Sequence, residues 1–330
     1  MLALYTSNFG QMETHDYDKV LFEAVKNRLA PDVSPVWFIM DVLSIGKEAA
    51  YRRLRGEVAL SLKEAALLSS ELGISLNDVA NNNSGKMHNY NLFLVDFETP
   101  DEVDYKVLQC YLDNICQGCN DPNSQLAVTT NVFPQQLYLR YKSIAKFAVF
   151  KWIYQSGERP IKAYHEVRIE DRMQQIFRDS RETHLRIKMT YYIFDRLLCR
   201  SLIHDLRYFT SVGLLKEEDT QTICGEAHKL LNYMEQIAIA GKYENGNEVY
   251  MYVSDLHFNK SYYNVRSGQY HASIIEACVL SSLASVDKNC YDKMNDWIHS
   301  RRRISTLISQ SGEPQRISFF KELRRQLDEL

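Results

Sequence analysis

The stretch Ile45-Gly-Lys-Glu-Ala-Ala-Tyr-Arg-Arg-Leu-Arg-Gly56 carries the most informative pattern in this chain. An α-helix turns by about 100° per residue, so Ala50 and Leu54 share one side of a helix over 47–55, and we expect both to face a hydrophobic interior. The opposite side carries Glu48, Arg52 and Arg55. The flanks carry Lys47, Tyr51 and Arg53. Gly56 is a natural left-handed stop for this helix.

The charge of this stretch differs from the charge of the whole chain. Four cations against one anion give residues 47–55 a local net charge of +3, whereas the 330-residue chain has a net charge of −3. The bulk charge therefore does not indicate nucleic-acid binding, and any such binding has to come from this local patch. The contents of hydrophobic (45%) and charged (25%) residues are those of a folded globular protein, which excludes disorder of the whole chain.

Two short helices are predicted before this stretch. An apolar stripe with i, i+4, i+8 spacing predicts a helix over 17–29. Proline suits the first turn of a helix, so Pro35 introduces a second helix, over 36–43. The turn Ser44-Ile-Gly46 then joins this second helix to the one over 47–55.

Two further helices are predicted after Gly56. Ser61 and Glu64 form a capping box, in which a hydroxyl and a carboxylate satisfy each other's backbone N–H groups, so a fourth helix begins here and stops at Gly73. Ser75-Leu-Asn-Asp78 repeats the pattern and starts a short fifth helix. Two helices joined by a short turn, inside a five-helix unit, form a helix-turn-helix arrangement. The expected core comprises Trp37, Ile39, Leu43, Leu54, Leu68 and Leu72.

Three pieces of this segment occur in an order that resembles a known family. The pieces are 45–56, Leu60-Ser-Leu-Lys-Glu-Ala65 and Glu71-Leu-Gly-Ile-Ser-Leu-Asn-Asp-Val79. Together they resemble the Cro/phage-repressor (XRE-type) helix-turn-helix transcriptional regulators over about residues 17–80. The resemblance implies a lambda-repressor-like domain whose third helix contacts DNA bases. The family often has Gln at the start of its second helix to touch a phosphate, whereas Ser34-Pro-Val-Trp37 stands here, so a Ser hydroxyl or a backbone N–H would have to make that contact.

The side chains over 47–55 match the chemistry of double-stranded DNA. An outward-facing Arg can donate two hydrogen bonds to guanine in the major groove, which discriminates between base pairs by about 1–3 kcal/mol. Glu48 can accept from cytosine, Lys47 and Arg53 suit phosphates, and Tyr51 can pack on a thymine methyl group or donate to a phosphate. The predicted DNA contacts are therefore Lys47, Glu48, Tyr51, Arg52, Arg53 and Arg55. The alternative is that this basic face is only a solvated surface.

The length suggests about two domains. Ala80-Asn-Asn-Asn-Ser-Gly-Lys86 is rich in turn-forming residues and has nothing apolar to bury, which is typical of a linker. We assign residues 1–80 to the helix-turn-helix domain, 81–90 to a linker and 91–330 to a larger domain.

The larger domain is predicted to be mostly helical with one small antiparallel sheet, which makes the whole chain mainly α. Strand character is present over 125–131 and again over 248–253 and 260–266. With the last two, a third strand around 270–280 would complete the small sheet, although a helix is also possible there. Helices are predicted over about 99–116, 133–154, 168–177, 181–209, 216–240, 288–303 and 313–330. The helix over 181–209 has a dense apolar face that suits a bundle or a dimer.

The larger domain shows no familiar catalytic pattern. A Gly-rich phosphate loop, a Gly-x-Ser-x-Gly elbow and a His-Glu-x-x-His motif are all missing from the sequence, so we expect no enzyme, cofactor or metal. The lone pair Cys116-Gln-Gly-Cys119 is interpreted as reduced thiols, with zinc or redox chemistry as the alternative. Arg301-Arg-Arg303 suits a helix C-terminus better than an anion site. Four tyrosines are expected in a half-buried core rather than in a ligand pocket: Tyr250, Tyr252, Tyr262 and Tyr263.

The start of the chain lacks a secretory signal, and no apolar run approaches the roughly 18 residues that cross a bilayer. We therefore expect a cytoplasmic protein without a membrane partner. The expected partners are double-stranded DNA, a second copy of the chain in a homodimer, and an unknown small-molecule or protein effector for residues 91–330. The alternative function is a protein-interaction scaffold that uses the helix-turn-helix as a contact surface.

Overall fold

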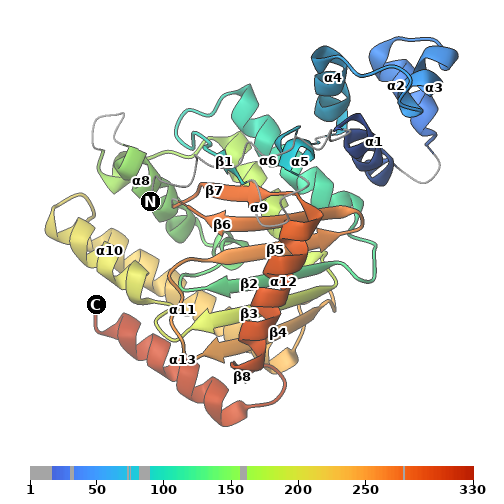
Figure 1. Ribbon diagram of the computed structural model, residues 1–330. Helices are drawn as coiled ribbons and strands as arrows, with labels where there is room; N and C mark the ends of the chain where they lie inside the picture. Colours follow the sequence, from blue (N-terminus) through green and yellow to red (C-terminus); the bar gives the residue numbers. More distant parts are fainter. Residues whose placement is uncertain are drawn as a thin grey trace, which may run out of the picture. The chain divides into compact units, whose positions relative to one another are not determined.

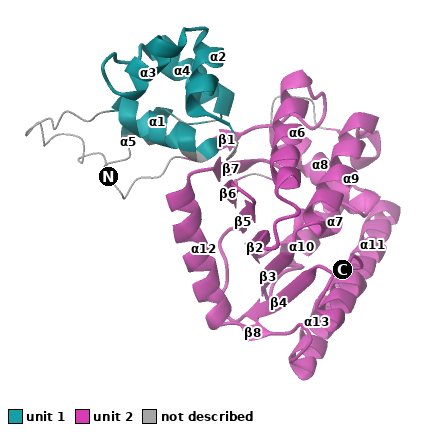
Figure 2. Cartoon of the chain, turned by 90° about the vertical axis from the view of Figure 1, so that its right-hand side faces the viewer, with its two compact units in different colours: residues 1–89 teal, residues 90–330 magenta. Residues whose placement is uncertain are grey.

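The computed structural model describes residues 17–29, 33–72, 74, 76–81, 90–156, 162–277 and 279–330. The chain divides into two compact units, residues 1–89 (unit 1) and 90–330 (unit 2) (Figure 2). Residues 82–89 of the predicted linker, together with Gly73 and Ser75, lie outside the described residues.

Unit 1 contains the predicted succession of short helices. The described ones are α1 (Tyr17–Arg28), α2 (Pro35–Leu43), α3 (Lys47–Leu54), α4 (Leu62–Leu72) and α5 (Leu76–Asn81). The predicted capping box is present at the start of α4, where the Ser61 N–H donates to the Glu64 carboxylate (2.8 Å) and the Glu64 N–H donates to the Ser61 hydroxyl (3.3 Å). Gly56 adopts a φ of +74° after α3, as expected for a left-handed stop.

The core of unit 1 forms where α2, α3 and α4 meet. Ile39, Ala50 and Leu68 are fully buried, and Leu54 packs against them. Trp37 is not part of this core, because 64% of its surface is exposed. The buried stripe of α2 contains Ile39 and its i+4 partner Leu43, whereas position 37 lies on the opposite side of the helix, about 200° from Ile39, so the prediction of Trp37 as a core residue is wrong.

Unit 2 is built on a mixed sheet. Within the described residues, eight strands pair in the order β1–β7–β6–β5–β2–β3–β4–β8 (Figure 1). The strands are β1 (Asn91–Phe93), β2 (Gln125–Thr130), β3 (Met189–Asp195), β4 (Glu248–Ser254), β5 (Tyr262–Ser267), β6 (Tyr270–Glu276), β7 (Ser282–Ser285) and β8 (Thr306–Leu307). The pairs β2–β3 and β3–β4 are parallel and the others are antiparallel. The prediction of a mainly α protein with a small antiparallel sheet is therefore wrong, and the fold is α/β.

The error arises at the central strand. The helix predicted over 181–209 is in fact the end of α9 (Asp171–Leu185), then β3, then α10 (Arg200–Ser211). Tyr192, Ile193 and Phe194 are all fully buried, because a central parallel strand is covered on both faces. Such a strand loses the polar–apolar alternation that identifies strands, so its apolar run also fits a helix.

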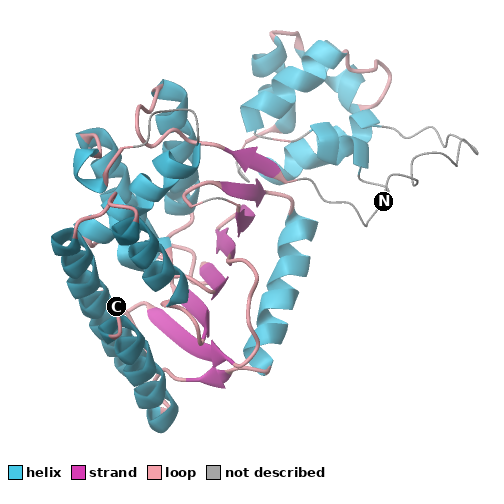
Figure 3. Ribbon diagram, turned by 90° about the vertical axis from the view of Figure 1, so that its left-hand side faces the viewer, coloured by secondary structure: helices cyan, strands magenta, loops and turns pink. Residues whose placement is uncertain are grey.

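Helices cover the sheet unequally, with α12 alone on one face and the other helices of unit 2 on the opposite face (Figure 3). On the α12 face, Ala127 and Ile193 of the sheet pack against Ile298. On the other face, Leu126 and Tyr192 belong to the main core. The remaining helices are α6 (Glu102–Gln117), α7 (Gln135–Tyr138), α8 (Lys142–Ser156), α11 (Glu217–Ala240), α12 (Lys288–Arg303) and α13 (Glu313–Asp328).

Most of the other elements lie where the sequence places them. α11, α12 and α13 agree with the predicted ranges within two residues, and the segment 270–280 begins with a strand rather than a helix. Two details differ. The helix expected over 133–154 is divided into α7 and α8, and the helix expected from residue 99 begins only at Glu102, after the cap Asp101 in a capping box with Asp104.

Candidate functional site

The predicted DNA-binding helix α3 follows α2 after a tight turn. Ser44 ends α2 in a left-handed conformation (φ 53°), and its N–H donates to the Asp41 carbonyl (3.3 Å). The Ile45 N–H donates to the Met40 carbonyl (3.2 Å), which satisfies a second C-terminal carbonyl of α2. Gly46 then caps α3 in an extended conformation. The turn predicted over 44–46 is therefore confirmed.

One side of α3 is buried and the other is exposed, as predicted. Ala50 is completely buried and Leu54 packs beside it against the core of unit 1. Tyr51 has 39% of its surface exposed, and about half of the side-chain surface of Arg52 and of Arg55 is exposed. The exposed face of α3 comprises Lys47, Glu48, Tyr51, Arg52 and Arg55. The Lys47 ammonium lies 6.0 Å from the centre of the Tyr51 ring.

Arg53, the sixth predicted contact, does not share this exposed face. Its guanidinium donates to the Glu64 carboxylate through Nε (3.1 Å) and Nη2 (2.7 Å), and to the Ala49 carbonyl through Nη1 (3.2 Å). Only 17% of the Arg53 side chain is exposed. Arg53 therefore holds α3 against the start of α4. The phosphate contact predicted for it stays a prediction, and it would require this ion pair to open.

The exposed cations of α3 have acidic neighbours. Arg55 forms ion pairs with Glu57 (2.6 Å) and Glu48 (3.2 Å), and Arg52 lies 3.6 Å from Glu57. The hydrogen bond from Arg55 lowers the pKa of Glu57 and raises the pKa of Arg55 itself. Exposed ion pairs contribute little to stability because water screens them, so a phosphate oxygen or a base acceptor can replace either carboxylate at little cost.

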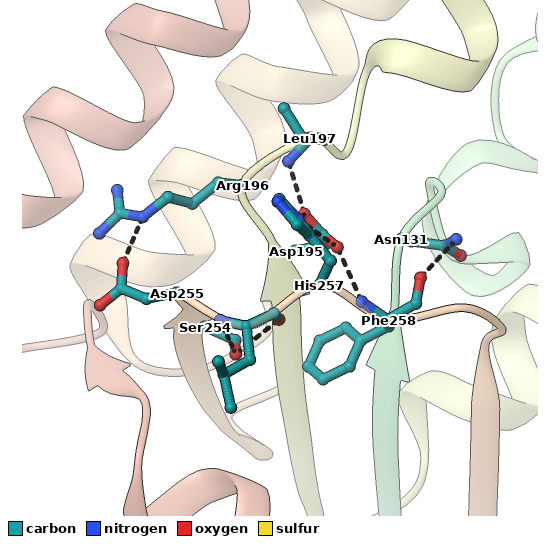
Figure 4. A network of polar contacts seen from close by, with 9 residues as sticks. Asn131, Asp195, Arg196, Leu197, Ser254, Asp255, His257 and Phe258 are labelled. Carbon is teal, nitrogen blue, oxygen red and sulfur yellow. Dashed lines mark hydrogen bonds and ion pairs between the residues drawn. The ribbon is translucent and has the colours of Figure 1, made fainter.

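A second group of polar residues lies at the edge of the sheet in unit 2. The parallel strands β2, β3 and β4 end there at Thr130, Asp195 and Ser254. The Asp195 side chain is almost fully buried and accepts hydrogen bonds from the N–H groups of Leu197 (2.8 Å) and Phe258 (2.9 Å) (Figure 4). This network therefore fixes the loop between β4 and β5 from one side.

The same loop is fixed from the other side by Asn131, whose amide donates to the Phe258 carbonyl (3.0 Å) (Figure 4). His257 Nδ1 lies 3.0 Å from an Asp195 oxygen, while 64% of the His257 side chain is exposed. An Nδ1–H facing the carboxylate leaves Nε2 as an acceptor toward solvent, which is the orientation of a general base. Among the described residues, no hydroxyl or thiol contacts this Nε2, so we assign no nucleophile to it.

These edge residues were missed by the sequence analysis. Asp195 follows the apolar run over 189–194 directly, and a polar residue at the end of a buried strand is the signal that could have found it. Assigning 181–209 to one helix hid that signal. Asn131 is different, because the strand over 125–131 was predicted but its last residue was given no role.

The other residues singled out in the sequence make packing contacts or are free thiols. Arg301 lies over the Trp297 ring (4.9 Å) and Arg302 over the Tyr191 ring (5.1 Å), in the last turn of α12. Tyr250 stacks on Tyr191 with ring centres 5.0 Å apart. Cys116 and Cys119 are free thiols at the end of α6.

No protein-family model, curated protein or solved structure matches this chain. Within the described residues, no group of three or more His, Cys, Asp or Glu side chains is placed to bind a metal ion. None of the described helices combines the length and apolar character that crossing a membrane requires.

Proposed function

We propose that this chain is a cytoplasmic transcriptional regulator of the XRE type that binds double-stranded DNA sequence-specifically through α3. The observation that carries the proposal is that one side of α3 is buried and the other is exposed. Ala50 and Leu54 hold one side in the core, while Arg52 and Arg55 stand exposed on the other. A short helix seated in this way can enter a major groove and bring guanidinium groups to base edges.

Each exposed residue has a role in the proposal. Arg52 and Arg55 contact guanines, and Glu48 accepts a hydrogen bond from a cytosine. Lys47 contacts a phosphate, and Tyr51 packs against a thymine methyl group. When DNA binds, base or phosphate acceptors replace Glu57 as the partner of Arg52 and Arg55, and the weakness of these exposed ion pairs supports that exchange.

A single copy of unit 1 would bind weakly, so we propose a homodimer on a palindromic operator with half-sites about 34 Å apart. Unit 2, residues 90–330, would sense an effector, hold the dimer together, or both. The apolar face once expected over 181–209 does not serve this purpose, because Ile193 and Phe194 are core residues of the sheet. We assign no catalytic reaction to the chain.

The test is selection of binding sequences from random double-stranded DNA, followed by titration of the selected site. We expect Arg52→Ala to weaken binding to that site by about 1–3 kcal/mol and to relax the base preference at one position of each half-site. Arg178→Ala is the matched control, because Arg178 is exposed on α9 in unit 2, where its guanidinium donates to the Gln175 side chain. Unchanged binding by the Arg52→Ala protein would refute the role given to this residue.

A second candidate function, a protein-interaction scaffold, is favoured by exposed apolar side chains of unit 1. Trp37 is 64% exposed and Leu62 is 80% exposed. Residues 17–81 also contain eight Lys and Arg against nine Asp and Glu, so this segment has no net positive charge to attract DNA. Salt dependence separates the two functions, since DNA affinity falls steeply with salt through counterion release whereas an apolar contact does not weaken in this way.

A further inference from the structure

A cavity of about 320 Å³ opens at the carboxyl end of β2, bounded also by the segment leading into β5, the end of β6, α8 and the start of α10. One wall of the cavity is apolar and combines aromatic and aliphatic side chains: Phe133, Ile144, Phe147, Leu198 and Leu202. Ligand sites in proteins commonly have this composition, with a few polar groups that fix the orientation of the ligand. The volume lies at the lower end of such sites and suits a molecule of amino-acid size.

The opposite wall carries one carboxylate among hydroxyl and amide groups. Glu276, at the end of β6, lies opposite Ser261, whose carbonyl accepts its N–H (3.1 Å). The Ser261 hydroxyl lies 2.9 Å from the Thr130 hydroxyl and 3.4 Å from the Asn131 amide oxygen. Burial raises the pKa of Glu276, and the Ser261 hydroxyl and two nearby lysines offset only part of this rise.

These lysines, Lys151 and Lys260, also line the cavity. The Lys151 ammonium is bound to Asp205 (2.8 Å), and in the described part of the chain no ion pair joins Glu276 to either lysine. Lys260 is exposed and has no ion-pair partner among the described residues. The cavity therefore presents one carboxylate without a cationic partner and one available cation, beside an apolar wall.

We propose that this cavity binds a small zwitterion of the α-amino-acid class with an aliphatic or aromatic side chain. The ammonium group lies against Glu276, the carboxylate group faces Lys260, and the side chain packs on Phe133 and Phe147. The residues that carry the polar contacts are already held in place, because Asp195 and Asn131 fix the loop that leads to Lys260 and Ser261. A site ordered before binding avoids part of the entropy cost of ordering it.

Ligands with a single charge fit this wall less well. A simple carboxylic acid would bring a second anion next to Glu276, and a simple amine would leave Lys260 unpaired while adding a cation beside Lys151. An ammonium group against Glu276 stabilises the charged carboxylate that burial disfavours. A molecule with one ammonium group, one carboxylate group and an apolar side chain therefore matches the cavity best, and this combination identifies the α-amino-acid class.

The test uses isothermal titration of the purified full-length chain with the standard aliphatic and aromatic L-amino acids, without DNA. We expect saturable binding of at least one of them. Phenethylamine and 3-phenylpropionate serve as probes that each lack one charge, and both should bind at least tenfold more weakly than the corresponding amino acid. Glu276→Gln should weaken amino-acid binding at least tenfold. Glu217→Gln, an exposed carboxylate on α11, is the matched control and should leave it unchanged.

A second variant keeps the proposal testable if Glu276→Gln fails to fold. Lys260→Ala alters an exposed side chain, and it should weaken binding of the amino acid while leaving binding of phenethylamine unchanged. Absence of binding by every amino acid tested, or binding that both variants leave unaltered, would overturn the proposal. If the chain is a regulator, this cavity would be its effector site, and that role rests on the proposed function. The titration measures amino-acid binding in the absence of DNA. Failure of amino-acid binding and failure of DNA binding are therefore separate outcomes.

Discussion

Arg53 and Arg55 lie two residues apart at the end of α3, and their surroundings give them different roles. Arg53 turns toward α4, where its guanidinium donates to the Glu64 carboxylate, and it also donates to the Ala49 carbonyl of its own helix. Arg55 stays exposed and pairs with carboxylates that are exposed themselves. The sequence indicates the cationic patch but not this difference, because Glu64 is distant from Arg53 along the chain.

Glu64 combines two functions, since it completes the capping box of α4 and pairs with Arg53. We expect Glu64→Ala to destabilise unit 1 by about 1–2 kcal/mol, whereas Glu64→Gln should cost less because it keeps an acceptor for the Ser61 N–H. Amide hydrogen exchange of α3 and α4 measures the difference. Equal protection in the wild type and in Glu64→Ala would contradict the assignment.

The Glu64 carboxylate also predicts a pH dependence. Hydrogen bonds from the Ser61 N–H and from Arg53 lower its pKa below 4.5 in the folded chain. The stability it contributes is therefore fully present above pH 4.5 and is lost as the pH falls through the lowered pKa. The exchange rates of α4 should rise in this acidic range in the wild type, and Glu64→Gln should remove this part of the rise.

His184 is buried in unit 2 as the neutral imidazole. Its Nδ1 lies 2.6 Å from the Ser180 carbonyl, which places the proton there, and its Nε2 lies 3.1 Å from the Tyr111 hydroxyl. Burial lowers the pKa of His184 to about 4. The unfolded chain therefore binds a proton that the folded chain does not bind between about pH 6.5 and 4, so stability falls as the pH falls.

The expected loss from His184 between pH 7 and pH 5 is about 2 kcal/mol. Urea denaturation at several pH values measures it. His184→Gln should reduce the pH dependence in this range, although the variant is less stable at pH 7, while His165→Gln, at an exposed histidine, should leave the dependence unchanged. An unaltered slope in the His184 variant would show that this residue does not titrate as described.

At the scale of elements, the predicted ranges are right where the sequence of a helix shows an apolar stripe at helical spacing and clear start and stop residues. α12 and α11 are long and begin and end close to the predicted residues. The strand β3 is missed by the sequence prediction because its apolar residues are buried on both faces of the sheet, so its sequence lacks the alternation of polar and apolar residues. β1 and β8, of three and two residues, are too short to leave a pattern at all.

One close approach between elements joins the end of α6 to the turn between β5 and β6. A Cβ atom added at Gly118 would overlap the backbone of Ser267 and Gly268. We expect Gly118→Ala to destabilise unit 2 by about 1–3 kcal/mol, since neither backbone segment can yield easily. Gly225→Ala is the matched control. Position 225 lies within α11 with nothing within 4 Å of the added atom, so the change should stabilise by up to about 1 kcal/mol.

Chemical denaturation of the two glycine variants gives the comparison directly. A Gly118→Ala protein as stable as the wild type would show that α6 and the β5–β6 turn do not meet as closely as described. The Gly225 variant distinguishes this packing effect from the general effect of replacing a glycine in or beside a helix.

At the scale of the whole molecule, the two candidate sites differ in how far the sequence could predict them. The exposed face of α3 is local, because nine consecutive residues define both its buried and its exposed side. The cavity is assembled from β2, α8, α10, β5 and β6, and its polar residues Asn131, Lys151, Ser261 and Glu276 are separated by up to 145 positions. Such a site becomes visible only when the strand order is known.

Each unit has its own buried core, which predicts that unit 2 folds without unit 1. Ile39, Ala50 and Leu68 form a core within unit 1, and Tyr192 and Phe194 belong to the core of unit 2. A chain that begins at Tyr90 should therefore show the circular dichroism and the cooperative unfolding of a folded α/β protein. It should also retain amino-acid binding and lose DNA binding, because the cavity lies wholly in unit 2 and α3 lies in unit 1. A truncated chain that aggregates, or that unfolds without cooperativity, would mean that the core of unit 2 depends on residues 1–89.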